Sequence, residues 1–105
     1  TLAISDARYL EDLPDWIGEL TDLAALQLEN TGVASLPASI TQLQCLTSIN
    51  LRDSVKFVEL PHDIGCLTSL VELNLRGCQA LVSLPLMDGL TRLTSLDLSR
   101  VDNVC

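Results

Sequence analysis

The leucine positions of this chain change their spacing in a regular order, and that order repeats. Between residues 60 and 85 the spacing begins near a helical interval, tightens to two residues at Leu73 and Leu75, and then widens again. This order predicts a turn of helix, a short strand and a loop back to the next turn. The period is marked by Leu-Pro, which recurs at intervals of 23, 24 and 24 residues, at Leu13–Pro14, Leu36–Pro37, Leu60–Pro61 and Leu84–Pro85. A unit of this size cannot bury its apolar edge alone, so we expect the copies to stack.

Aligned on Leu-Pro, the copies place two apolar residues, separated by one residue, at the same position of each unit. These pairs are Leu2/Ile4, Leu26/Leu28, Ile49/Leu51, Leu73/Leu75 and Leu96/Leu98. The alternation predicts five short strands, half-buried and side by side in a parallel sheet. Behind each Leu-Pro, apolar residues follow in steps of three, as in Ile17, Leu20 and Leu23, which predicts short helical or 3-10 turns with proline at their first position. The fourth return, Pro85–Leu90, is one residue shorter, and we expect Met87 to fill the core there.

The segment after each strand predicts a buried bend. One position of each bend holds Ala7, Thr31, Ser54, Cys78 and Val101. A buried polar side chain at this position can satisfy backbone groups that the sheet leaves open, and Thr31, Ser54 and Cys78 have one. Ala7 and Val101 do not, so we expect the hydrogen-bond ladder to fail at both ends. A second inward column follows at Leu10, Val33, Phe57, Leu81 and Val104, which places Phe57 in the core.

These patterns predict an α/β fold in the form of a solenoid. It is a curved right-handed coil with five short parallel strands on the concave face and short helical or 3-10 turns on the convex face. Residues 1–105 comprise about four and a half repeats of 23–24 residues. Neither end has the polar outer face of a capping repeat, because Leu2, Ile4, Leu98 and Val104 would expose an apolar edge. We therefore expect a fragment that is uncapped at both ends and belongs to a longer protein.

The charge of the chain excludes two classes of partner. The net charge is −8, and the first 29 residues hold seven carboxylates and a single arginine. Nucleic acids require a basic stripe, and anionic membranes attract basic segments, so neither is an expected partner. The longest unbroken apolar run, Leu23–Leu26, is far too short to span a membrane. The acidic residues either keep an apolar repeat protein soluble or form a patch for a basic partner.

No catalytic or metal-binding motif is present. The cysteines Cys45, Cys66, Cys78 and Cys105 form no C-x-x-C pair, and no histidine stands at ligand spacing from them. His62, the only histidine, follows Pro61 at the start of a turn, where an exposed imidazole without a catalytic role is expected. Free thiols and the absence of an Asn-x-Ser/Thr sequon predict a cytoplasmic protein. We expect no cofactor, no small-molecule substrate and no enzyme activity.

With these registers aligned, the chain resembles the leucine-rich repeat family over all 105 residues. The strand, the bend and the Leu-Pro-x-x-Ile-Gly return all recur in phase. The sequence is most similar to the repeats of plant intracellular nucleotide-binding disease resistance proteins, which mix a longer unit such as LNLRGCQALVSLP with a shorter one such as LQLENTGVASLP. The resemblance implies a non-catalytic module that recognises a pathogen protein or restrains a neighbouring domain of the same chain. The alternatives are a cytosolic scaffold that binds a GTPase or phosphatase, and the substrate-recognition arm of an enzyme.

The strand residues that point away from the core form the expected binding surface. The predicted protein-binding residues are Gln27, Glu29, Ser48, Asn50, Arg52, Asp53, Glu72, Asn74, Arg76, Ser95, Asp97 and Ser99. Adjacent strands are ~4.8 Å apart, so Arg52 and Arg76 are expected side by side. Two interpretations remain open for this pair. Either Glu29, Glu72 and Asp53 neutralise the arginines, or the arginines form a small basic spot that holds a carboxylate of a protein partner.

Overall fold

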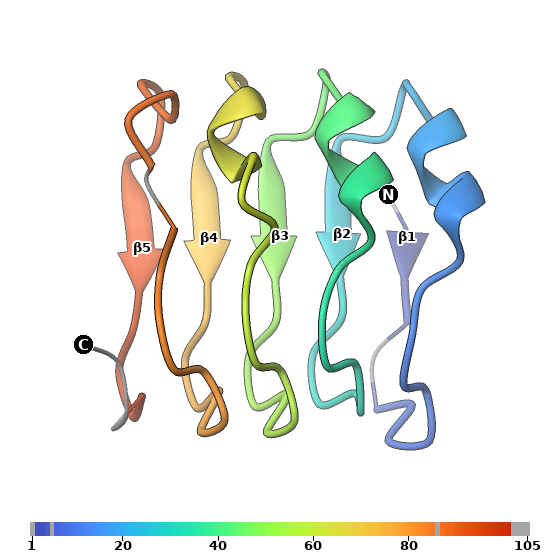
Figure 1. Ribbon diagram of the computed structural model, residues 1–105, viewed down its shortest axis with the longest axis vertical. Helices are drawn as coiled ribbons and strands as arrows, with labels where there is room; N and C mark the ends of the chain where they lie inside the picture. Colours follow the sequence, from blue (N-terminus) through green and yellow to red (C-terminus); the bar gives the residue numbers. More distant parts are fainter. Residues whose placement is uncertain (1, 5, 86, 102–105) are drawn as a thin grey trace.

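The computed structural model describes residues 2–4, 6–85 and 87–101, and its five strands form one parallel sheet (Figure 1). The strands follow one another in the sheet in chain order, and they are β1 (Leu2–Ala3), β2 (Ala25–Gln27), β3 (Ser48–Asn50), β4 (Glu72–Asn74) and β5 (Ser95–Asp97). The pairing register joins one residue of each strand into a continuous apolar column of Leu2, Leu26, Ile49, Leu73 and Leu96. The predicted solenoid and its strand register are confirmed.

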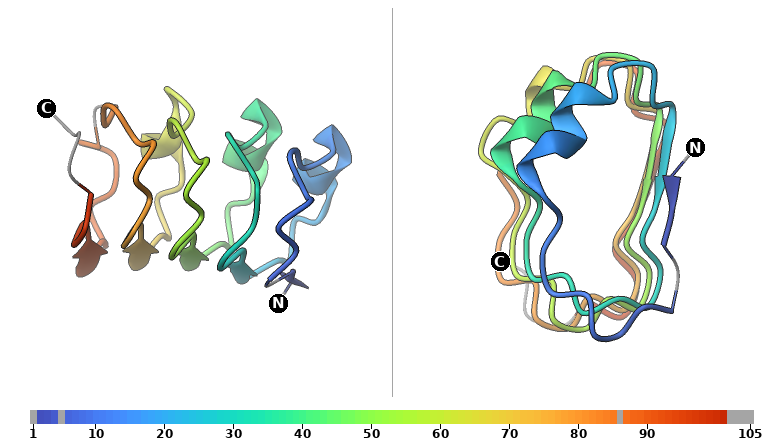
Figure 2. Two further views of the ribbon diagram at one scale, coloured as in Figure 1. Left: turned by 90° about the horizontal axis from the view of Figure 1, so that it is seen from below. Right: turned by 90° about the vertical axis from the view of Figure 1, so that its right-hand side faces the viewer.

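Short returns lie opposite the sheet and fan outward, so that the sheet occupies the inner side of the curve (Figure 2). Three of them contain 3-10 helices, η1 (Asp15–Glu19), η2 (Ala38–Gln42) and η3 (Ile64–Cys66). Each helix is closed by the same hydrogen bond, as where the N–H of Leu20 donates to the carbonyl of Ile17 at 3.1 Å. Pro14 precedes η1 with extended backbone, ψ 152°, and its carbonyl accepts the N–H of Ile17. Pro14 and Pro37 therefore lie one position before their helices, and not at the first position as expected, whereas Pro61 lies further before η3.

The fourth return contains a turn but no helix within its described residues, 87–90. The N–H of Leu90 donates to the carbonyl of Met87 at 2.9 Å, which is the equivalent of the closing bond in the other returns. One residue fewer between proline and leucine leaves too little chain for the helical turn. Met87 is partly buried and packs against the core, as the shorter segment predicted.

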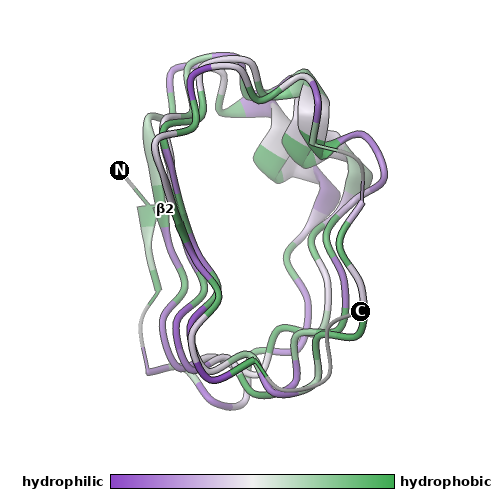
Figure 3. Ribbon diagram, turned by 90° about the vertical axis from the view of Figure 1, so that its left-hand side faces the viewer, coloured by the Kyte–Doolittle hydropathy of each residue, from purple (hydrophilic) through white to green (hydrophobic). Residues whose placement is uncertain are grey.

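The core fills the space between sheet and returns with side chains from every coil. Viewed along the stack, the backbones of successive coils superimpose, so that equivalent residues lie one above another (Figure 3). Fully buried residues include Leu26, Leu28, Ile49, Leu51 and Phe57. The predicted core position of Phe57 is confirmed, whereas the prediction for Val104 lies outside the described residues.

A ladder of polar side chains ties the buried bends together. The hydroxyl of Ser54 donates to the carbonyl of Leu28 at 2.8 Å, and the thiol of Cys78 donates to the carbonyl of Leu51 at 3.0 Å. Each of these bonds joins a bend to the end of the preceding strand. The hydroxyl of Thr31 donates to the carbonyl of Leu28 at 3.1 Å, within its own coil. The predicted role of these three side chains is confirmed, and it satisfies carbonyls that would otherwise be buried without a donor.

We expect Leu73→Ala to lower the free energy of unfolding by about 2–5 kcal/mol, because it leaves a cavity between two fully packed coils. The side chain of Leu73 is only 1% exposed. Val82→Ala, at a side chain that is 51% exposed, is the control and should change the free energy by no more than about 0.5 kcal/mol. Urea denaturation followed by circular dichroism measures both values. Equal losses in the two variants would contradict the core assignment.

Burial raises the pKa of the Cys78 thiol to about 11. Near about pH 8 this thiol stays protonated and is a poor nucleophile, whereas Cys45 and Cys66 are exposed. Iodoacetamide is therefore expected to modify Cys45 and Cys66 rapidly, and Cys78 only after denaturant is added. Mass spectrometry of timed samples distinguishes the sites. Modification of Cys78 at the rate of the other two, without denaturant, would be inconsistent with the buried bend.

Candidate functional site

The strand register places the predicted surface residues in rows across the sheet. Gln27, Asn50, Asn74 and Asp97 are paired in sequence along one row, and Ser48, Glu72 and Ser95 along a second. A third row lies just beyond the strands, where the backbone carbonyls of Glu29, Arg52, Arg76 and Ser99 each accept an N–H from the preceding coil. Leu26, Ile49 and Leu73, which alternate with these rows, are buried. The structure thus brings eleven of the twelve predicted residues together on one face.

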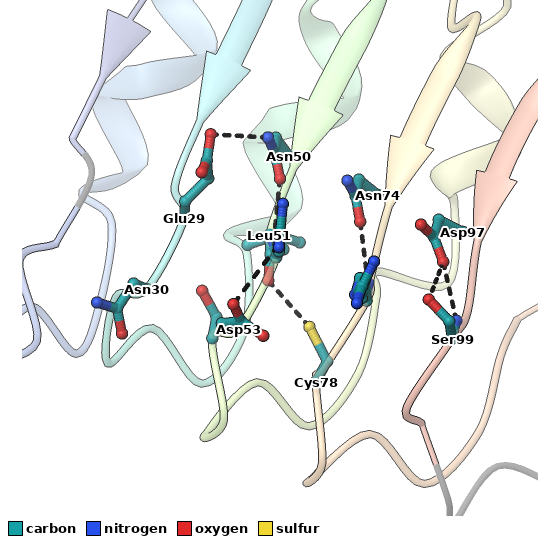
Figure 4. Close-up of polar contacts among 12 residues, drawn as sticks. Glu29, Asn30, Asn50, Leu51, Asp53, Asn74, Cys78, Asp97 and Ser99 are labelled. Atoms are coloured by element: carbon teal, nitrogen blue, oxygen red, sulfur yellow. Dashed lines mark hydrogen bonds and ion pairs between the residues drawn. The ribbon is translucent and has the colours of Figure 1, made fainter.

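Hydrogen bonds to the backbone orient the central row (Figure 4). The side-chain oxygens of Asn50 and Asn74 accept the N–H groups of Arg52 and Arg76, each at 3.0 Å, and Asp97 accepts that of Ser99 at 2.9 Å. In each of these turns, a side-chain oxygen accepts the backbone N–H of the residue two positions later. The side chain is thereby fixed at the end of its strand. The row is therefore a structural feature of the coil as well as a surface.

The amide of Asn50 also donates to a carboxylate oxygen of Glu29 at 2.9 Å. This bond follows from the turn just described, because the oxygen of Asn50 is held by Arg52 and its NH₂ group consequently points toward β2 (Figure 4). Glu29 is therefore engaged by an amide and does not neutralise an arginine. Asn74 has the same turn, and its NH₂ group has no acceptor within the part of the chain that the structure describes.

Of the two concave arginines, Arg52 has a carboxylate partner and Arg76 has none among the described residues. Nε of Arg52 lies 3.6 Å from Oδ2 of Asp53, and both side chains are about half exposed. Such an exposed pair contributes about 0–1 kcal/mol and leaves Arg52 available to a partner. Neutralisation of the pair by Glu29 and Glu72 is therefore not observed, whereas neutralisation by Asp53 is. The functional role of the arginines stays a prediction.

Asp97 supplies negative charge at the β5 end of the surface. Hydrogen bonds from the hydroxyl and N–H of Ser99 lower the pKa of Asp97 below its ordinary value, and the charges of Arg76 and Arg52 add to the effect. The carboxyl group is therefore ionised at neutral pH. The carboxylates of Glu29 and Asp97 therefore lie on either side of the two arginines across the sheet.

One repeated feature of the bends was not predicted. In every coil the third residue after the strand has a positive φ, between 55° and 74°, at Asp6, Asn30, Asp53, Gly77 and Arg100. Glycine, asparagine and aspartate tolerate this left-handed conformation better than other residues. Four of the five positions carry one of these three residue types, which is a signal that the sequence contains. Asp53, predicted as a strand-face residue, belongs to this column and lies at the bend.

A metal centre and a membrane-spanning helix each require features that the described residues do not contain. No group of three His, Cys, Asp or Glu side chains that could hold a metal ion occurs among residues 2–4, 6–85 and 87–101. His62 is exposed at the turn before η3. No helix in the described residues is long and apolar enough to cross a membrane.

Comparison with known proteins agrees with this geometry. A sequence profile described as "Leucine-rich repeat region" matches residues 2–103. The leucine-rich repeat domain of the type III effector XopL has a similar structure, with a TM-score of 0.58 and 27% sequence identity over 83% of this chain and 38% of that chain.

Two plant proteins show which leucine-rich repeats these resemble. TMV resistance protein N of Nicotiana glutinosa is 34% identical over 85 residues, which cover 80% of this chain and 7% of that protein. Disease resistance protein RFL1 of Arabidopsis thaliana is 32% identical over 101 residues, which cover 96% of this chain and 11% of that protein. The chain thus spans only a small part of either relative. It belongs to the leucine-rich repeat family and is related to the repeats of plant disease resistance proteins.

Proposed function

We propose that this chain is a non-catalytic protein-recognition segment of a cytoplasmic plant disease resistance protein. The eleven residues of the concave rows, with Asp53 at the adjoining bend, contact either a pathogen protein or a neighbouring domain of the same chain, which they hold inactive. The relationship to two plant disease resistance proteins supports this assignment of class. The exposed, unpaired thiols of Cys45 and Cys66 support a reducing compartment.

The observation that carries the proposal is the alignment of polar side chains into rows across β2–β5. An open, polar surface of this kind suits a protein partner better than a small molecule, which prefers an enclosed apolar pocket. Arg76 and the NH₂ group of Asn74 provide two donors on one strand face without acceptors in the described residues. A carboxylate on the partner matches both donors.

We further propose that this chain is part of a longer protein, in which further repeats stack on both ends of the sheet. Leu20 is 37% exposed, whereas its counterparts Leu43 and Leu67 are fully buried by the preceding coil. At the other end, Leu96 is 42% exposed, whereas Leu73 is buried between two coils. Additional coils would cover both edges, which agrees with the small share of the plant relatives that this chain spans.

The double variant Arg52→Ala/Arg76→Ala tests the concave surface in the full-length protein. Loss of two charge-assisted contacts is expected to weaken association with the partner by about tenfold. In leaf tissue, this loss appears as cell death without a pathogen, if the surface restrains a neighbouring domain. It appears as loss of the response to the pathogen protein, if the surface binds that protein.

Arg92→Ala serves as the matched control, because Arg92 is exposed on a return and lies outside the sheet. The control should behave as the unmodified protein, and the double variant should keep the midpoint of thermal unfolding. A double variant that shows neither of the two altered responses, while folding normally, would refute the proposal.

A further inference from the structure

A second surface arises from a difference in bend length between neighbouring coils. The segment from Leu28 to Leu36 is one residue shorter than the equivalent segments Ile4–Leu13 and Leu51–Leu60 on either side. Gly32 lies in this short bend and packs tightly on the preceding coil, where an added Cβ would lie 2.5 Å from the carbonyl oxygen of Arg8. The second bend is therefore shorter than the bends on either side of it, and a hollow lies between those two longer bends.

The hollow, which we name the bend hollow, has a volume of about 440 Å³. Asn30, Thr31 and Gly32 of the short bend line it, together with Arg8 from the first coil and Val55 and Lys56 from the third. Asn30 and Asp53, which also line it, lie at consecutive bends (Figure 4). This volume falls within the range of about 300–1,000 Å³ that ligand-binding clefts occupy.

The two cations that line the bend hollow come from separate coils, and neither has a carboxylate partner among the described residues. Arg8 and Lys56 are both exposed, and neither forms an ion pair within the described part of the chain. The carboxylates close to the hollow are already engaged, since Asp53 pairs with Arg52 and Asp6 accepts a hydrogen bond of 3.0 Å from Asn30. Arg8, Lys56 and Arg52 carry three positive charges, and the two aspartates carry two negative charges. The surroundings of the hollow therefore have a net charge of +1, on a chain whose net charge is −8.

One apolar side chain, Val55, lines the same hollow, and an exposed tyrosine follows Arg8 in the sequence. Val55 is 50% exposed on one wall, and Tyr9, next to Arg8, is 99% exposed. Tyrosine is enriched where proteins bind one another, because its ring adds apolar area and its hydroxyl tolerates water. The hollow therefore combines unpaired positive charge with apolar area.

We propose that the bend hollow binds a single aspartate or glutamate side chain of a protein partner. The carboxylate lies between Arg8 and Lys56, and apolar residues flanking it in the partner pack on Val55 and Tyr9. The net charge of +1 complements one carboxylate, whereas the nearby Asp6 and Asp53 disfavour a doubly charged phosphate. This surface lies at the bends, so it is separate from the concave rows and does not depend on their function.

A peptide titration of the full-length protein tests the proposal. The probe is a pentapeptide with blocked ends, one glutamate between two leucines and an alanine at each end, labelled with an uncharged dye. The matched probe carries glutamine in place of glutamate. Fluorescence anisotropy is expected to show about fivefold tighter binding of the glutamate peptide, as two partly exposed charge pairs predict.

The double variant Arg8→Gln/Lys56→Gln is expected to abolish the difference in affinity between the two peptides. The variant is expected to fold normally, because both side chains are exposed. Arg76→Ala, which removes a concave charge, should leave the difference intact, so failure here and failure of the concave proposal are distinguishable. Equal binding of both peptides to the unmodified protein, absence of binding, or a preference that survives in the Arg8/Lys56 variant would each overturn the proposal.

Discussion

Every coil of this solenoid has to place its apolar side chains beside the equivalent side chains of the adjacent coils, because a single coil cannot bury them alone. The column through Leu26, Ile49 and Leu73 meets this constraint with side chains that are buried on both sides. The parallel register follows from it, since a shift by one residue would turn the apolar column outward. The polar rows of the concave face exist for the same reason. They are the residues that the alternation leaves on the other side.

The bends are the second constraint, because each must reverse the chain while its backbone is buried. Two features recur in these bends. One is a residue with left-handed backbone conformation, such as Asp53 or Gly77, and the other is a buried side chain that donates a hydrogen bond to a backbone carbonyl, such as Ser54 or Cys78. One bend and one return differ in length from their counterparts, whereas the pairing register of the strands stays the same. Loss of one residue in the second coil leaves the sheet unchanged and creates the bend hollow beside it. Variation in length between coils therefore lies in the bends and the returns, outside the sheet.

Much of the fold could be predicted from the sequence, because burial repeats with a period that is visible in the leucines. The strand register, the core position of Phe57 and the roles of Thr31, Ser54 and Cys78 all follow from that period. Local competition among hydrogen bonds could not be predicted. The repeat alignment suggests that Glu29 would neutralise an arginine. In the structure Glu29 instead accepts a hydrogen bond from Asn50, because the turn between Asn50 and Arg52 directs the Asn50 amide toward it. The left-handed column does have a sequence signal, which is its series of aspartate, asparagine and glycine.

The register of the sheet is tested most directly by disulfide formation between cysteines introduced on the concave face, with Cys45 and Cys66 replaced by serine. Gln27→Cys and Asn50→Cys are paired on adjacent strands, ~4.8 Å apart, which is within the distance that a disulfide spans. Gln27→Cys with Asn74→Cys places the thiols two strands apart, at about 9.6 Å, which is too far. We predict rapid oxidation of the first pair and none of the second. Oxidation of both at similar rates, or of the second alone, would contradict the stacked register on which the fold and its surfaces depend.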